Sequence, residues 1–210
     1  MAKIFRVAVA VFLLILLGLG AWLYGEIRAR VIISDWAINA TSVGRHIDEA
    51  KIKTPLNAAE EIINQVYFNG RVKTHGVLCP SVPNTFKSSQ SGPAVFLATK
   101  VASEIQMPRT FYDQINRLVI ACRLETKYSH SVLLRLWMAT AYYGDGDVGA
   151  EAASAKLFGK PVAELNQDEA LVLAALLWMP GYRNSPEALQ RRVDAFRPKL
   201  EAPANQRRNC

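Results

Sequence analysis

The amino-acid sequence predicts an all-α protein in which a single N-terminal transmembrane helix precedes one helical domain. Two observations carry this prediction: an uncharged apolar run close to the N-terminus, and apolar residues that recur at helical spacing in the second half of the chain. The 210 residues leave room for one domain with a proper core, but not for two large ones. We therefore expect a membrane anchor over residues 1–30, the domain over 31–200 and a tail over 201–210.

The anchor is predicted from Val7 to Gly25, a run that contains no charged residue. At about 1.5 Å per residue, a helix of this length crosses most of a hydrocarbon core of roughly 30 Å. The run is longer than the roughly 7–15 apolar residues of a signal peptide, and no clear small-x-small cleavage site follows it. An uncleaved anchor is therefore favoured over a cleaved leader. Basic residues flank the run almost equally and leave its orientation open.

Composition argues against several functions. The formal net charge is +7, yet no basic run is interleaved with aromatic residues, so we expect no nucleic-acid partner. A basic balance suits an anionic membrane surface or a phosphate-bearing lipid. We expect no metal site and no cofactor, because no CxxC or HExxH pattern joins the scattered cysteines and histidines, which are Cys79, Cys122, Cys210, His46, His75 and His130. Cys122 lies on an apolar helical face, which favours a small buried hydrophobe over a nucleophile.

Helical spacing of apolar residues predicts the elements of the domain. It indicates a short helix over Asn57–Tyr67, a second over Pro93–Ile105, and two amphipathic helices after Phe111 that are separated by a polar break at Lys127–Ser131. Residues 69–92 are rich in glycine, proline and serine without a sustained period. We expect that segment to form an extended loop or lid.

Start and stop signals define the last two helices. Asn166 and Glu169 have the spacing of a capping box, and Pro180 follows the end of the helix that this box begins. The interior of this helix is apolar on almost every side, so we expect it at the centre of the domain. Ser185 and Pro186 give the cap and first position of a final helix.

The segment YGDGDVGAEAA, residues 143–153, holds three glycines within six residues. This concentration predicts a turn that needs positive φ or a close backbone approach before a new helix starts. Gly144, Gly149 and Glu151 are the best binding-site candidates of this segment. Two interpretations stay open. In the first, the glycines form the turn and the negative charge of Glu151 interacts favourably with the helix dipole. In the second, the N-terminus of the helix binds a phosphate group.

A longer stretch carries a resemblance to a known family. Residues 117–186 are collinear with a helix ending in LE, a serine-led helix, and the motifs G-x-x-x-Y-G-x-x-A-A, F-G-K-x-x-x-x-L and L-x-x-x-E-A-x-x-L-A before a proline. In this order they resemble the C-terminal part of the family 51 glycosyltransferase domain. That family comprises the peptidoglycan polymerases, including monofunctional biosynthetic transglycosylases and bifunctional penicillin-binding proteins.

The resemblance implies a lysozyme-like helical domain on the periplasmic side of the bacterial inner membrane, held by a single-pass anchor. It implies that lipid II, or a related undecaprenyl-pyrophosphate lipid, is the partner, together with the membrane and other cell-envelope proteins. The family's chemistry needs two acidic side chains. One carboxylate takes the proton of the acceptor hydroxyl, while the second and nearby cations, with or without a divalent metal, assist departure of the pyrophosphate.

The sequence departs from the family in the motifs that carry this chemistry. No E-D-x-x-F-x-x-H-x-G motif is present, and Arg117 stands where R-K-x-x-E has its glutamate. The serine-led helix has His130 for lysine and Arg135 for glutamate. The acids available for catalysis are Glu60, Glu61, Asp113 and Glu125. The candidate substrate-binding residues are Arg117, Arg123, His130, Gly144, Gly149 and Glu151.

Three interpretations remain open. The chain is a degenerate family member that binds lipid II without polymerising it, an active glycosyltransferase with relocated acids, or a helical interaction protein of the envelope. Glu125 also has a simpler reading, as a charge on a helix surface. Two acids that face one cleft in the folded domain would favour the enzyme.

Overall fold

The computed structural model describes residues 14–20, 25–26, 30, 34–50, 56–68, 92–107 and 111–201. All regular elements in these ranges are helices, and no sheet is present there, which confirms the all-α prediction. Much of the predicted anchor and nearly all of the predicted loop at 69–92 lie outside the described residues. Within the described part of the chain, no helix has the length and apolar character needed to span a bilayer.

The main helices lie within a few residues of their predicted ranges. In chain order the elements are α2 (Ser42–Arg45), α3 (Ile47–Ala50), α4 (Ala58–Phe68), α5 (Pro93–Glu104), α6 (Phe111–Lys127), α7 (His130–Thr140), α8 (Ala150–Phe158), η1 (Val162–Glu164), α9 (Gln167–Trp178), η2 (Pro180–Asn184) and α10 (Pro186–Glu201). The short elements α2, α3, η1 and η2 were not predicted, because so few residues show no clear periodicity.

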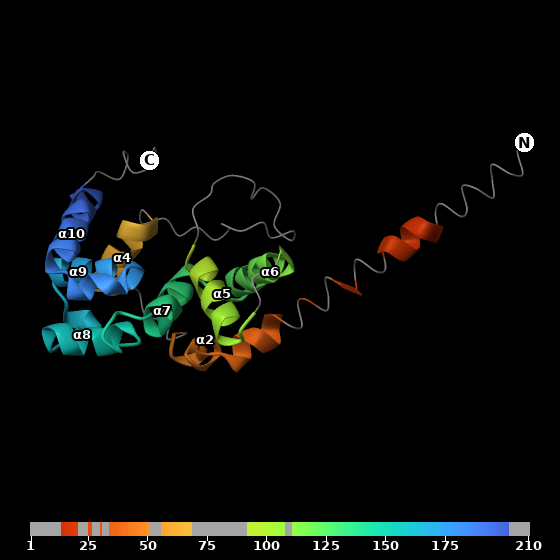
Figure 1. The fold of residues 1–210 in the computed structure, drawn as a ribbon, viewed down its shortest axis with the longest axis horizontal. Helices are drawn as coiled ribbons and strands as arrows, with labels where there is room; N and C mark the ends of the chain where they lie inside the picture. Colours follow the sequence, from red (N-terminus) through yellow and green to blue (C-terminus); the bar gives the residue numbers. More distant parts are fainter. Residues whose placement is uncertain are drawn as a thin grey trace, which may run out of the picture.

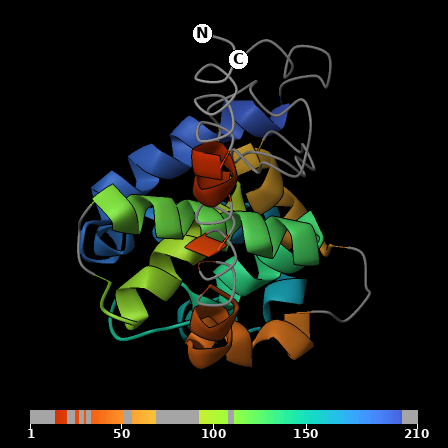
Figure 2. The ribbon, with the colours of Figure 1, turned by 90° about the vertical axis from the view of Figure 1, so that its right-hand side faces the viewer.

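The helices gather into two groups that α7 joins. Helices α8, α9 and α10 lie at one end of the domain with α4 packed against α9 and α10, while α5 and α6 lie at the other end (Figure 1). Helix α7 packs on α5 and also contacts α4 and α8. Figure 2 shows α5 and α6 lying across the face turned to the viewer, with residues 34–50 below them. Segments far apart in the sequence therefore meet around α7.

Helix α9 forms the centre of the domain, as the sequence predicts. Its N-terminus carries the predicted capping box, in which the Asn166 side chain accepts from the Glu169 amide and Glu169 Oε2 accepts from the Asn166 amide at 2.8 Å. Leu171, Leu173 and Leu176 are each 0% exposed. Complete burial of residues on several sides of one helix requires neighbours all round it, and α4, α8 and α10 supply them.

An aromatic cluster fills the space between α4, α5, α7, α9 and α10. Phe96 stacks on Trp137 with ring centroids 4.5 Å apart, and Tyr67 meets Trp137 edge-on at 5.3 Å. Offset and edge-on aromatic pairs of this kind stabilise a core by more than their burial alone. The other members of the cluster are Phe68, Trp178 and Phe196.

Cys122 has a feature that the sequence left open. The half-buried side chain packs against the core as expected, but it is also part of a disulfide, which the sequence analysis did not predict. Its partner lies outside the described residues. Spacing along the chain does not show which distant cysteines come together, because that depends on the tertiary fold.

Candidate functional site

The glycine-rich segment forms a tight turn between α7 and α8. An isolated bridge pairs Tyr142 with Val148, and inside it the Tyr143 amide donates to the Asp147 carbonyl at 2.9 Å. Gly144, Gly146 and Gly149 have φ values of 90°, 85° and 92°. The predicted positive φ is thus present at all three glycines, where a side chain would strain the backbone.

Two of these glycines also lie against other backbone atoms. A Cβ on Gly144 would lie 2.7 Å from the Pro180 carbonyl oxygen, and one on Gly149 would lie 2.9 Å from the Ala139 carbonyl oxygen. A Cβ on Gly146 would meet nothing within 4 Å. The backbone of the turn therefore packs closely against other backbone at two places. Gly144 lies against η2, and Gly149 lies against α7.

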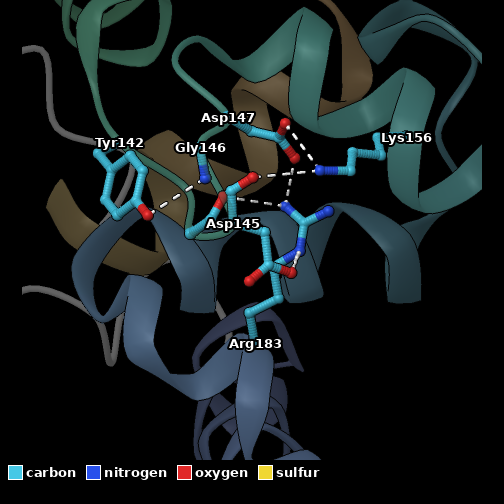
Figure 3. A network of polar contacts seen from close by, with 7 residues as sticks. Tyr142, Asp145, Gly146, Asp147, Lys156 and Arg183 are labelled. Atoms are coloured by element: carbon cyan, nitrogen blue, oxygen red, sulfur yellow. Dashed lines mark hydrogen bonds and ion pairs between the residues drawn. The ribbon is translucent and has the colours of Figure 1, made fainter.

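Ion pairs hold the turn in place (Figure 3). The Arg183 side chain is only 8% exposed, and it contacts Asp145 at 2.9 Å and Asp147 at 2.5 Å. Lys156 of α8 lies 3.3 Å from the second Asp147 oxygen. Burial by itself would raise the pKa of Asp147, but hydrogen bonds from Arg183 and Lys156 outweigh it and lower the pKa. These contacts tie η2 and α8 to the turn that contains Gly144.

A cavity of about 450 Å³ lies at the N-terminus of α8. It is lined by residues from α2 to η1, which are His46, Ala50, Glu60, Arg135, Met138, Ala139, Val148, Gly149, Ala150, Glu151, Ala152 and Val162. Gly149 is the N-cap of α8 and provides no side-chain cap, so amides of the first helical turn have no acceptor within the helix. Of the predicted site residues, Glu60, Gly149 and Glu151 meet here.

Glu60 lies on the cavity wall, and both of its carboxylate oxygens accept hydrogen bonds from the protein. Its Oε1 accepts from Arg135 Nε at 2.9 Å, and its Oε2 accepts from Arg135 Nη2 at 3.1 Å and from the Asn57 amide at 2.9 Å. The Asn57 side chain accepts in return from the Glu60 amide at 2.8 Å, which is the geometry of a capping box. Glu60 therefore caps α4 and binds the arginine that replaces the family's glutamate on α7.

Glu151 and His46 complete the polar wall. Glu151 Oε2 accepts from the Val162 amide at 3.1 Å, which joins α8 to η1. His46 Nδ1 lies 2.8 Å from the Ser42 carbonyl oxygen, and the half-buried residue lines the cavity. Sequence reasoning missed His46, since an isolated histidine in an unpatterned stretch gives no signal.

The remaining predicted residues do not line this cavity. Arg123 Nη2 donates to Asp35 at 2.7 Å, and this hydrogen bond lowers the pKa of Asp35. His130 is 4% exposed, its Nε2 lies 2.8 Å from Asn64 Oδ1, and burial lowers its pKa. Glu61, Asp113, Arg117, Glu125 and Gly144 also lie outside the lining. A ligand role for any of these residues stays a prediction.

No metal centre is visible in the described ranges, where no three histidine, cysteine or acidic side chains gather closely enough to hold an ion. Of the two carboxylates of the cavity, Glu60 accepts hydrogen bonds on both oxygens, from Arg135 and Asn57, and Glu151 accepts one on Oε2, from Val162.

The protein is thus a helical domain in which a glycine-rich turn leads into the short helix α8, and the N-terminus of α8 borders a cavity. The sequence profile of the Transglycosylase family matches residues 89–200, more than half of the chain. The chain belongs to this family, which confirms the resemblance seen in the sequence. The match includes α5 to α10 but not α2 to α4, so His46, Ala50 and Glu60 lie outside it.

Three relatives show how far the similarity extends. The chain is 38% identical over 97 residues to penicillin-binding protein 1A of Aquifex aeolicus, 44% over 57 residues to a biosynthetic peptidoglycan transglycosylase of Citrobacter koseri, and 32% over 99 residues to another from Rhodospirillum centenum. These matches cover 44%, 27% and 42% of this chain, and 13%, 24% and 43% of the relatives. The chain therefore matches less than half of the length of each relative.

Proposed function

We propose that the chain binds lipid II, or a related undecaprenyl-pyrophosphate lipid, at the cavity beside α8 and does not polymerise it by the two-carboxylate mechanism of the family. In this proposal the domain is lysozyme-like and works in cell-wall biosynthesis. Family membership supports the ligand, and the polar cavity at the glycine turn supports the place.

The observation that carries the absence of polymerisation is the environment of Glu60. A general base needs an oxygen that can reach the substrate's hydroxyl proton. Both oxygens of Glu60 already accept hydrogen bonds, two from Arg135 and one from the Asn57 amide. The carboxylate is thus a helix cap and an ion-pair partner. Arg117 stands at the place of the family's second glutamate and supplies a guanidinium, which has only donors, instead of a carboxylate.

The proposed location is the periplasmic side of the inner membrane, with an anchor over residues 7–25. The disulfide at Cys122 supports it. Disulfides persist in oxidising compartments such as the periplasm and are rare in the cytosol, where thiols are kept reduced.

One observation favours a second candidate, an active glycosyltransferase with relocated acids. Glu60 and Glu151 line the same cavity, which is the arrangement that two-carboxylate chemistry requires. In this second candidate function Glu151 is the general base. Its Oε2 accepts a hydrogen bond from the Val162 amide, and Oε1 would take the proton of the acceptor hydroxyl.

The test combines turnover and binding on the full chain purified in a mild detergent. Labelled lipid II is incubated with the protein, the products are run on a gel, and binding is measured in parallel. We expect binding without glycan chains. Ala152→Trp fills the cavity from an exposed helix position and should abolish binding, whereas Ala155→Trp, exposed on the same helix but outside the lining, should not.

Each other outcome selects a different function. Glycan chains made by the wild-type chain would contradict the proposal, and their loss in Glu151→Gln but not in Ala155→Trp would establish the relocated-acid enzyme. If no form of the chain binds lipid II, the result would favour the third interpretation, a helical interaction protein of the cell envelope. Equal loss of binding in both tryptophan variants would mean that α8, and not the cavity, had been damaged.

A further inference from the structure

We propose that the cavity takes the saccharide portion of its ligand rather than the pyrophosphate, and that His46 selects the saccharide by accepting a hydrogen bond from one of its hydroxyl groups. This inference rests on the proposed function and assigns the chemistry of the same site.

The backbone fixes which nitrogen of the neutral His46 ring is the hydrogen-bond acceptor. Nδ1 lies 2.8 Å from the Ser42 carbonyl oxygen. A carbonyl oxygen only accepts hydrogen bonds, so Nδ1 carries the proton and donates it. In the neutral ring the lone pair is then on Nε2, which has no hydrogen-bond partner among the described residues. His46, which lines the cavity, therefore carries one acceptor that the described protein groups do not use.

The charges around the cavity disfavour a pyrophosphate. Its lining contains two carboxylates, Glu60 and Glu151, and one guanidinium, Arg135, which is paired with Glu60 at 2.9 Å. A pyrophosphate would therefore meet Glu151 without a compensating cation from the lining, and like charges in a partly buried site repel. The preference of the α8 N-terminus for negative charge is already met by Glu151 in its first turn.

The same lining suits a sugar. Glu151 Oε1 and His46 Nε2 can accept from hydroxyl groups, while Met138, Val148 and Val162 offer apolar contact to the C–H faces of a ring. Small-molecule sites combine apolar walls with a few placed polar groups in volumes on the order of 300–1,000 Å³. The cavity, at about 450 Å³, lies within that range.

His46 lies outside residues 89–200, the part that matches the Transglycosylase profile, whereas α7 and α8, which also line the cavity, lie inside it.

The test uses the full chain in detergent and isothermal titration with two probes, the uncharged amino-sugar disaccharide di-N-acetylchitobiose and inorganic pyrophosphate. We expect the wild-type chain to bind the disaccharide and not the pyrophosphate. His46→Phe keeps an aromatic ring of similar size without the acceptor, and it should weaken disaccharide binding about 3- to 10-fold, the loss of one hydrogen bond. His46→Gln restores a carbonyl acceptor and should recover part of the affinity.

Arg45→Ala is the matched control, because Arg45 is exposed, adjacent in sequence and outside the lining, and it should bind as the wild type does. Unchanged disaccharide affinity in His46→Phe, or binding of pyrophosphate in preference to the disaccharide, would overturn the inference. Lipid II binding is measured on the same samples. If the lipid binds and the disaccharide does not, this inference fails while the proposed function stands; if neither binds, both fail.

Discussion

Gly144→Ala tests the close packing of the glycine turn against η2, with Gly146→Ala as its control. Both residues have positive φ, 90° and 85°, so a Cβ costs about 1–2 kcal/mol of backbone strain at either position. Only at Gly144 would that Cβ also lie 2.7 Å from the Pro180 carbonyl oxygen. Overpacking of this kind adds about 1–3 kcal/mol. We expect the free energy of unfolding to fall by about 2–5 kcal/mol for Gly144→Ala and about 1–2 kcal/mol for Gly146→Ala.

Urea denaturation of the full chain in detergent measures both variants. Tryptophan fluorescence is a suitable probe, because Trp137 is 7% exposed in the aromatic cluster and reports the loss of the core. Equal losses of stability in the two variants would refute the reasoning, since the contact with Pro180 is what distinguishes them. A change in slope with urea would point to an altered unfolded state and make the comparison invalid.

Three further predictions concern the core, pH and topology. Leu173→Ala removes a fully buried side chain at the centre of α9 and should lower the free energy of unfolding by about 2–5 kcal/mol; a loss below about 1 kcal/mol would contradict a central α9. Burial lowers the pKa of His130 in the folded state, so the unfolded state binds the proton more readily, and stability should be full above about pH 6.5 and fall as the pH decreases below it. His130→Gln should flatten that decrease in urea titrations from pH 7.5 to 5, and an unchanged slope would assign it to other groups. A reporter that is active only outside the cytoplasm, fused to the C-terminus of the chain, should be active in cells; activity of a cytoplasmic reporter there would reverse the proposed topology.

Local interactions explain what the sequence by itself determined. Helical periodicity located α4 to α7, and the Asn166–Glu169 pair located the start of α9, because caps and apolar faces depend on residues within one or two turns. The crowding of glycines predicted positive φ in the turn for the same reason. The collinear motifs of residues 117–186 also identified the family correctly.

Only the tertiary structure decided what the candidate site contains. Glu60 could not be assigned from sequence, since its role depends on Arg135, which is 75 residues away along the chain. His46 had no recognisable pattern around it, and it became a candidate only because the fold places it at the same cavity as residues of α7 and α8. The Cys122 disulfide likewise depends on a distant partner. Contacts between residues far apart in the sequence depend on how the helices pack around α7. The order of side chains along the chain does not show this packing.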